Sequence, residues 1–365
     1  MKILMTTDSI GGVFVYSVEL VRELHARGHQ VTLAVLGGAL SSTQSDALRG
    51  IYGLQIEELP GALEWMDEPW KDVAATGGAL LRLAERLQPD CVHLNELAHG
   101  ALAWPAPVVV VGHSCVQSWW RAVHGEPAPA KYERYREVVR ASLAAASCVV
   151  APSSAQLREL ARHYGPLPRG RAIANGIDAS SFKPQPKQPL ILSAGRLWDQ
   201  GKNAALLAQV APKLGWPVLL AGNTQAPEGR ASELAGDNCR PLGPLTRTEL
   251  ADVMARAAIY ALPARYEPFG LSVLEAAASG CALVLGRVPS LVENWAGAAC
   301  FVDPNDPEEL QHTLETLMAN PHRCEQWASQ ALARAQTFSA ERMGTAYEGM
   351  YRELAHMHTG VPCAS

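Results

Sequence analysis

Two glutamates separated by seven residues are the first candidates for chemistry in this chain. Glu267 lies in the polar and glycine-containing stretch 265–270, and Glu275 lies in the apolar run that follows it. A carboxylate accepts hydrogen bonds from neighbouring hydroxyls, which is how sugars and riboses are held. A carboxylate within an apolar helix needs a partner, and a ligand hydroxyl or a cation would serve. The alternative, a Glu275 that faces solvent from an amphipathic helix, is disfavoured by its apolar neighbours.

A pair of cations forms the second candidate site. Arg196 and Lys202 lie in the segment 195–203, between an apolar run and a helical pattern. A planar guanidinium and a compact ammonium at the start of a helix suit a diphosphate. Considered without other segments, the same pair would be two surface cations on a solvated turn.

A glycine pair forms the third candidate. Gly11 and Gly12 lie in the run Asp8–Val13, between the first strand candidate and the first helix candidate. Glycines let a backbone approach a ligand closely, and a helix start offers free N–H groups to an anion. The run is not G-x-G-x-x-G, which disfavours a dinucleotide site. A tight strand-to-helix turn without a ligand explains this run equally well.

The elements that must position these residues alternate between strand and helix. Continuous apolar runs are typical of strands covered on both faces of a parallel sheet. In the first half, such runs predict strands at Ile3–Met5, Val31–Leu36, Leu54–Leu59, Cys91–Leu94, Val108–Val111 and Cys148–Val150. Helical patterns lie between them, at Val13–Arg27, Lys71–Leu87, Tyr132–Ala145 and Ser153–Tyr164.

The alternation stops at the proline-rich segment 183–189 and then starts again. Its three prolines make it a poor helix and a poor strand, so we interpret it as an interdomain linker. The second half has strand candidates at Leu190–Ala194, Val218–Ala221, Ile259–Leu262, Ala282–Leu285 and Ala299–Val302. Its helix candidates are Asn203–Lys213, Thr248–Arg256, Leu271–Ser279 and most of the chain from residue 307 to Met357.

This pattern predicts two doubly wound α/β domains. We expect the N-terminal domain to cover residues 1–183, joined by a C-terminal helix at about 339–360, and the second domain to cover 184–338. Ligands of such sheets lie beyond the carboxyl ends of the strands, so the cleft between the domains is the expected site.

The bulk composition excludes several other classes of protein. A formal charge of −5 argues against a general nucleic-acid or anionic-membrane binder. The eight cysteines form no C-x-x-C pair, and most of them lie in apolar runs, as in a reducing cytosol. No apolar run approaches the length of a membrane span. We therefore expect a cytoplasmic protein whose contact with the inner face of the membrane, if any, is peripheral.

The segment from Glu267 to Ala276 resembles the E-x7-E signature of retaining GT-B glycosyltransferases, specifically of glycosyltransferase family 4. The resemblance extends along nearly the whole chain. Asp8–Val13 is similar to the family's N-terminal glycine-rich loop, Asn175–Asp178 to its N-G-I-D run, and Gly195–Lys202 to its Arg/Lys diphosphate site. This order implies a GT-B fold, with two Rossmann-like domains, an interdomain cleft and a crossing C-terminal helix.

The resemblance also implies roles for single residues. Arg196 and Lys202 would contact the diphosphate of the donor and offset charge on the leaving group. Glu275 would bind the ribose and Glu267 the hydroxyls of the transferred sugar. The backbone of the helix start would help to hold sugar and phosphate, through Phe269, Gly270, Leu271 and Ser272.

In the N-terminal domain, the resemblance implies that Gly11 and Gly12 approach the diphosphate or the acceptor. The family has a functional histidine after a strand of this domain, and His113 follows Val108–Val111 in the same way. His113 would contact the donor sugar. His93 and His99 are better explained as structural histidines. The segment Ser118–Arg121 is either an aromatic platform for the acceptor or a packed loop.

The expected reaction is metal-independent transfer of a hexose, with retention, from a nucleoside diphosphate sugar, a UDP-sugar being favoured. The leaving phosphate would help to take the proton of the acceptor, which is a small molecule, a glycan or a lipid-linked molecule. We expect no resident cofactor and no bound metal, and the oligomeric state stays open. A GT-B phosphorylase, a nucleotide-sugar epimerase and a non-catalytic nucleotide-sugar-binding protein remain alternatives. The glycine loop lacks the lysine typical of glycogen and starch synthases, which disfavours that activity.

Overall fold

The computed structural model describes residues 1–226, 229 and 234–359. The chain divides into two compact α/β units. Unit 1 contains Met1–Arg121, Glu126–Gly176 and the described residues from Ala340 to Thr359, and unit 2 contains Ala122–Gly125 and the described residues between Ile177 and Ser339. None of the helices in these described ranges is long and apolar enough to cross a membrane.

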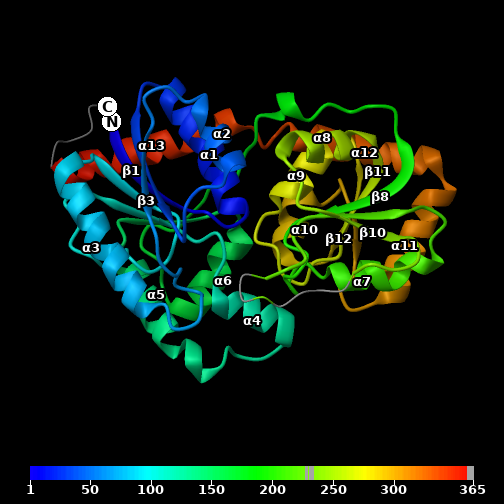
Figure 1. Ribbon diagram of the computed structural model, residues 1–365, viewed down its shortest axis with the longest axis horizontal. Helices are drawn as coiled ribbons and strands as arrows, with labels where there is room; N and C mark the ends of the chain where they lie inside the picture. The colour runs from blue at the N-terminus through cyan, green and yellow to red at the C-terminus, as the bar shows by residue number, and fades with distance from the viewer. Residues whose placement is uncertain (227–228, 230–233, 360–365) are drawn as a thin grey trace. The chain divides into compact units, whose positions relative to one another are not determined.

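The sheet of unit 1 is parallel throughout. Its strands lie in the order β3-β2-β1-β4-β5-β6-β7 (Figure 1). They are β1 (Lys2–Asp8), β2 (Gln30–Leu36), β3 (Gln55–Leu59), β4 (Cys91–Leu94), β5 (Val108–Val111), β6 (Cys148–Ala151) and β7 (Arg171–Ala172). Every residue of β4, β5 and β6 is buried, so the centre of the sheet is covered on both faces.

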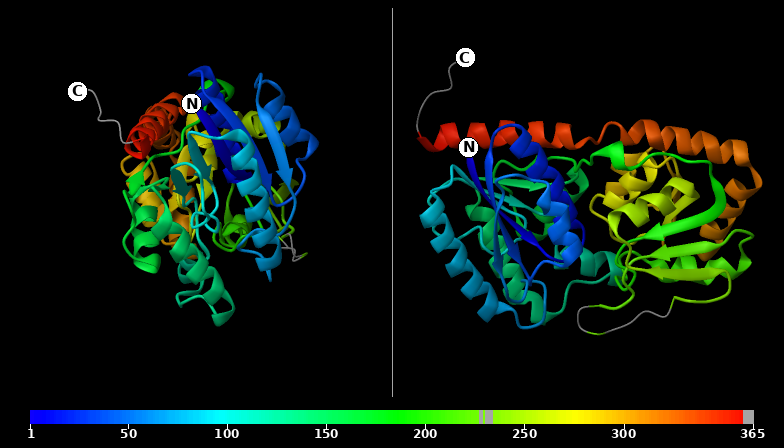
Figure 2. Two further views of the ribbon diagram at one scale, coloured as in Figure 1. Left: turned by 90° about the vertical axis from the view of Figure 1, so that its left-hand side faces the viewer. Right: turned by 45° about the horizontal axis from the view of Figure 1, so that its top comes forward.

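The helices of unit 1 include one from the far end of the chain. They are α1 (Gly12–Ala26), α2 (Ser42–Arg49), α3 (Trp70–Leu87), α4 (Val116–His124), α5 (Glu133–Ala145), α6 (Ser154–Tyr164) and α13 (Ala340–Thr359). Helix α13, drawn in red in Figure 2, packs against α1, drawn in blue. The expectation that the last helix returns to the N-terminal domain is therefore confirmed.

Unit 2 is built on a second parallel sheet, in the order β10-β9-β8-β11-β12-β13. Its strands are β8 (Gln188–Ala194), β9 (Val218–Ala221), β10 (Cys239–Gly243), β11 (Ala257–Leu262), β12 (Ala282–Gly286) and β13 (Cys300–Val302). Its helices are α7 (Ala204–Val210), α8 (Arg247–Arg256), α9 (Leu271–Ala278), α10 (Pro289–Trp295), α11 (Pro307–Ala319) and α12 (Pro321–Ala335).

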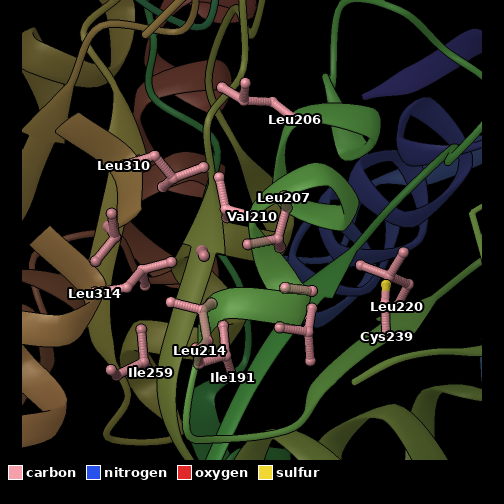
Figure 3. Packing of buried hydrophobic residues seen from close by; sticks show 14 of the residues in the cluster. Ile191, Leu206, Leu207, Val210, Leu214, Leu220, Cys239, Ile259, Leu310 and Leu314 are labelled. Carbon is pink, nitrogen blue, oxygen red and sulfur yellow. The ribbon is translucent and has the colours of Figure 1, made fainter. Parts of the chain in front are cut away.

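Apolar side chains from both helices and strands close the core of unit 2. Figure 3 shows Leu207 and Val210 of α7, Leu310 and Leu314 of α11, and Ile259 of β11 among the packed side chains. All five are at most 2% exposed. Each buried side chain of this size contributes about 1.5–3 kcal/mol relative to leaving it in water. This packing joins α7 and α11 to β11.

Two expected boundaries need correction. Unit 1 ends at Gly176 and not at residue 183. The reason is that Ile177 pairs with Ser339 and donates a backbone hydrogen bond of 3.2 Å to Phe338, so the chain already belongs to unit 2 there. The segment 183–189 is also not entirely a linker, because β8 begins at Gln188.

Three of these helices begin at a residue whose side chain caps them. Ser153 accepts a hydrogen bond from the Gln156 amide at the start of α6. Thr246 and Glu249 form the full capping box of α8. Asp306 caps α11 and is followed by a proline at the first helical position.

Candidate functional site

The charged candidates of unit 2 lie at the point where the strand order of the sheet reverses. The order runs outward from β8 through β9 on one side and from β11 through β12 on the other. The loop after β8 carries Arg196 and Lys202, and the loop after β11 carries Glu267. The two loops are joined because the amides of Arg265 and Tyr266 both donate to the Gly201 carbonyl, at 2.9 and 3.1 Å. A switch point is where ligands of doubly wound sheets bind.

Arg196 is held by two neighbours in its own loop. Its guanidinium donates to the Asp199 carboxylate at 2.8 Å and lies 5.4 Å from the centre of the Trp198 ring. Asp199 is buried and also accepts a hydrogen bond of 2.8 Å from the Gly201 amide. The guanidinium therefore has a defined direction, which a cation on a solvated turn would lack.

Lys202 and Glu267 form the second ion pair of this site. The Lys202 ammonium lies 2.5 Å from one Glu267 carboxylate oxygen, and the other oxygen accepts from the Phe269 amide at 3.3 Å. Ser290 donates a short hydrogen bond to the Glu267 carbonyl. The loop that carries Glu267 is thus fixed from α10 as well as from its own turn.

Helix α9 begins directly beyond Glu267. Gly270 precedes it with a φ of 90°, and a Cβ there would lie 2.9 Å from a methyl carbon of Val273. Only glycine fits such a position without strain. Glu275 is buried in the second turn of α9, as its apolar neighbours predict.

Tyr260 is a further polar residue of this site. It lies on β11, and its hydroxyl is 3.0 Å from the Ala194 carbonyl and 2.8 Å from the Ser272 hydroxyl. Burial, followed by smaller contributions from the charges of Glu267 and Glu275, raises the pKa of Tyr260. It therefore stays neutral and connects the end of β8 to the start of α9.

In unit 1 the glycine loop follows β1. The Ile10 amide donates to the Asp8 carboxylate at 3.0 Å, and Gly11 has a φ of 89° just before α1 starts at Gly12. The two glycines thus make the strand-to-helix turn that their position predicts.

His113 follows β5 and belongs to a buried hydrogen-bond network. Its Nε2 lies 2.8 Å from the side-chain oxygen of Asn95, and the Nε2 of His93 lies 2.9 Å from the same oxygen. Tyr16 of α1 packs edge-on against the His113 ring, with 4.5 Å between the ring centres. Burial and the charge of His93 lower the pKa of His113 to about 3. His113 is therefore a neutral imidazole at physiological pH.

The other histidines discussed above have structural partners. His93 is fully buried, and its Nδ1 lies 2.5 Å from the Tyr351 hydroxyl. His99 bonds to the Val73 carbonyl at 2.9 Å and pairs with Glu96 at 3.0 Å. Residues 118–121 belong to the helix α4, so of the two interpretations of this segment the packed loop is wrong.

The structure therefore groups the sequence candidates into two sets. Arg196, Lys202, Glu267 and the start of α9 share one switch point of unit 2, and His113 lies in unit 1 near Tyr16 of α1. Sequence reasoning missed Asp199, Tyr260 and Asn95 as partners. Asn95 had a recognisable signal, because it directly follows a predicted strand at the carboxyl edge. Within the described ranges, no group of three His, Cys, Asp or Glu side chains is placed to hold a metal ion.

Two family models match the chain, one after the other. The model described as Glycosyltransferase Family 4 matches residues 10–181, and the model described as Glycosyl transferases group 1 matches residues 177–334. A glycogen synthase of Mycobacterium tuberculosis is 26% identical over 92% of this chain and 92% of its own length. A D-inositol 3-phosphate glycosyltransferase of Xylanimonas cellulosilytica is 28% identical over 95% of this chain and 93% of its own.

Solved structures show the same fold at lower identity. A sucrose-phosphate synthase from Thermosynechococcus elongatus has a TM-score of 0.83 at 19% identity, covering 97% of this chain and 99% of its own. Anabaena HepE in complex with UDP and glucose has a TM-score of 0.78 at 18% identity, covering 97% of this chain and all (100%) of its own. Both family models, the relatives and the switch-point site of unit 2 agree. The chain therefore belongs to the family 4, group 1 glycosyltransferases, enzymes of GT-B fold that transfer a sugar from a nucleotide sugar.

Proposed function

We propose that this glycosyltransferase moves a hexose from a UDP-sugar to a hydroxyl acceptor, with retention of anomeric configuration and without a metal ion. The observation that carries the proposal is the pairing of both loop cations with carboxylates, Arg196 with Asp199 and Lys202 with Glu267. Two positive charges oriented at a switch point suit the two phosphates of a donor. Support for the UDP-sugar comes from HepE, whose complexes contain UDP and UDP-glucose.

In this proposal the diphosphate replaces the Glu267 carboxylate as the partner of Lys202, while Arg196 keeps its bond to Asp199. The donor phosphate takes over the Lys202 ammonium, which releases the Glu267 carboxylate to accept hydrogen bonds from hydroxyls of the sugar. Arg196, held by Asp199, and the amides at the start of α9 then stabilise the negative charge that develops on the leaving group. Glu275 binds the ribose. The leaving phosphate accepts the proton of the acceptor hydroxyl on the same face of the sugar.

The test measures the rate at which the protein hydrolyses UDP-glucose, both with and without excess chelator. Arg196→Ala and Lys202→Ala should each lower kcat by about 100-fold or more, since each removes a charge that stabilises the transition state. Lys213→Ala, which removes an exposed lysine of the same unit, is the matched control and should leave kcat unchanged. A strict requirement for Mg²⁺ or Mn²⁺, or near-normal turnover of both variants, would refute the assignment.

The stereochemistry can be measured without knowing the acceptor. When water replaces the acceptor, proton NMR of fresh UDP-glucose hydrolysate should show α-glucose first, before mutarotation. First appearance of the β-anomer would contradict retention. A phosphorylase would instead require inorganic phosphate and form sugar 1-phosphate, an epimerase would change the sugar of the donor, and a binding protein would give no product.

A further inference from the structure

Asn203 directly follows Lys202 and is almost completely buried, with only 3% of its surface exposed. Its side-chain nitrogen donates two hydrogen bonds, to the Pro263 carbonyl at 2.9 Å and to the Pro304 carbonyl at 2.7 Å. Pro263 directly follows β11, and Pro304 lies beyond the end of β13. A single side-chain amide therefore joins the loop that carries Lys202 to two other loops at the carboxyl edge of the unit 2 sheet.

The geometry of Asn203 makes two demands on the type of residue at this position. Both carbonyls can only accept hydrogen bonds, so the side chain has to supply two donors. The backbone is left-handed, with φ 58° and ψ 36°. Asparagine is one of the few residues other than glycine that adopt this conformation readily. Glycine would meet the second demand but not the first.

The backbone on the other side of Lys202 is fixed to one of the same loops. The Gly201 carbonyl accepts from the amides of Arg265 and Tyr266, at 2.9 and 3.1 Å. Lys202 thus lies between two attachments to the loop that ends in Glu267, and its ammonium meets that carboxylate at 2.5 Å. The stem of a lysine is long and flexible, so a fixed backbone on both sides is what limits where the ammonium can go.

We propose that Asn203 is a positioning residue that holds the Lys202 ammonium where it meets the donor diphosphate. This inference rests on the proposed function, in which Lys202 passes from Glu267 to a phosphate. Without the amide of Asn203, the loop keeps only its attachment at Gly201 and the ammonium is displaced. A displacement of about 1 Å at a reacting centre can cost about 100-fold in rate.

The first experiment measures the reactivity of Lys202 without any donor. Acetic anhydride acetylates accessible amines, and mass spectrometry gives the rate for each lysine. The exposed Lys213 of the same unit is the reference within each sample. In the wild type, Lys202 should react more slowly than Lys213, because its side chain is 18% exposed and paired with Glu267.

Asn203→Gly should remove this protection. The rate of Lys202 should rise toward the rate measured in Glu267→Gln, which releases the ammonium from its partner, while Lys213 keeps its rate. Glycine keeps the left-handed backbone and leaves room for a water molecule that can bond to both carbonyls, so the variant should stay folded by circular dichroism. If it does not fold, Asn203→Ser, whose hydroxyl keeps one donor, takes its place under the same expectation. An unchanged rate of Lys202 in the folded variant overturns the proposal.

The second experiment measures kcat for the hydrolysis of UDP-glucose in two double-mutant cycles. Asn203→Gly alone should lower kcat by about tenfold or more. In a Lys202→Ala background the same change should cost less than about twofold, because no ammonium is left to place. In an Arg196→Ala background it should cost its full factor, because Arg196 is held by Asp199 within its own turn.

These cycles separate positioning of Lys202 from general support of the site. A full loss in both backgrounds would show that Asn203 does not act through Lys202, and the proposal would then be wrong. If the wild type neither binds UDP nor hydrolyses UDP-glucose, the proposed function fails. The acetylation rates still decide in that case whether Asn203 places the Lys202 ammonium, because they are measured without a donor.

Discussion

Three buried side chains of unit 1 have pKa values that are shifted by burial and by the charges of one another. Glu64, Glu96 and His99 lie together beyond β4, and the Leu97 amide donates to Glu64 at 3.2 Å. Burial lowers the pKa of His99, but the neighbouring Glu96 outweighs it and raises the value to about 9. Glu96 is thus ionised beside an imidazolium. Burial, and then the charge of Glu96, raises the pKa of Glu64 from 4.5 to about 7.

The raised pKa of Glu64 predicts a dependence of stability on pH. The folded state holds this proton more tightly than the unfolded state, so the stabilisation is complete below pH 4.5 and is lost as the pH rises through 7. Glu64→Gln mimics the protonated form. The variant should match wild type near pH 5 and exceed it at pH 8 by up to about 3 kcal/mol in the free energy of unfolding. Urea unfolding at both pH values measures this.

Glu68→Gln is the matched control, since Glu68 is exposed in the same loop and should change little at either pH. A Glu64→Gln variant that is less stable than wild type at pH 8 would mean that the Glu64 carboxylate is ionised and stabilising in the folded protein. In that case, hydrogen bonds that a glutamine side chain cannot make would offset the free-energy cost of burying the Glu64 carboxylate.

At the scale of elements, the sequence predicted the strands that contain apolar runs and missed β7 and β10. The expected strands at 91–94, 108–111 and 218–221 match β4, β5 and β9 at both ends. Strand β7 has two residues, and β10 contains Pro241 and a shift in register, so neither gives an apolar run. Pro241 is tolerated because β10 is at the edge of its sheet.

Three helices were also missed, for different reasons. Helix α2 is polar, but its capping box of Ser41 and Gln44 is visible in the sequence and could have revealed it. Helix α4 depends on tertiary contacts instead, such as the bond of 3.4 Å from the Val116 amide to the Tyr135 hydroxyl. Helix α10 is short and starts at Pro289.

In the proline-rich segment 183–189, one lysine side chain forms hydrogen bonds to the ends of two helices. Lys187 exposes much of its stem, but its ammonium bonds to three carbonyls, of Ser279 at 2.6 Å, Ala255 at 2.9 Å and Met254 at 3.4 Å. These carbonyls are at the ends of α9 and α8, where unpaired carbonyls favour a cation.

Lys187→Met should therefore destabilise unit 2. It keeps the stem but removes the ammonium, and we expect a loss of about 1–2 kcal/mol, the lower part of the range for charged hydrogen bonds because the stem is exposed. Guanidinium unfolding followed by tryptophan fluorescence measures it. Lys183→Met, an exposed lysine of the same segment, serves as control. Equal stabilities of the two variants would show that water satisfies the three carbonyls as well as the Lys187 ammonium does.

At the scale of the whole molecule, the first and the last of the described helices lie in the same unit. Helix α13 lies against α1, and its Tyr347 ring is fully buried, 6.1 Å from the Tyr16 ring and 5.3 Å from the His93 ring. The Glu348 carboxylate next to it binds the His29 ring at 3.1 Å and the Arg27 guanidinium at 3.3 Å. The last helix is thus part of the core that supports His113.

Tyr347→Ala should lower the temperature at which unit 1 unfolds. Removal of a buried aromatic ring costs about 3–5 kcal/mol when the site cannot collapse. Scanning calorimetry should show the transition of unit 1 moving down. Tyr52→Ala removes the same side chain from a position of unit 1 that is 99% exposed, and should leave the transition in place. Similar transitions in both variants would mean that α13 contributes little to the stability of unit 1.

The sequence by itself determined the two doubly wound units, most strand positions and the charged candidates for the site. It could do so because buried parallel strands leave continuous apolar runs, and because Arg196, Lys202, Glu267 and Glu275 lie in segments whose order is typical of one family. Only the tertiary structure decided which groups meet. The ion pair of Lys202 with Glu267 and the bond of His113 to Asn95 join residues from different loops. Such contacts depend on the order of strands in the sheet, which the spacing of residues along the chain does not encode.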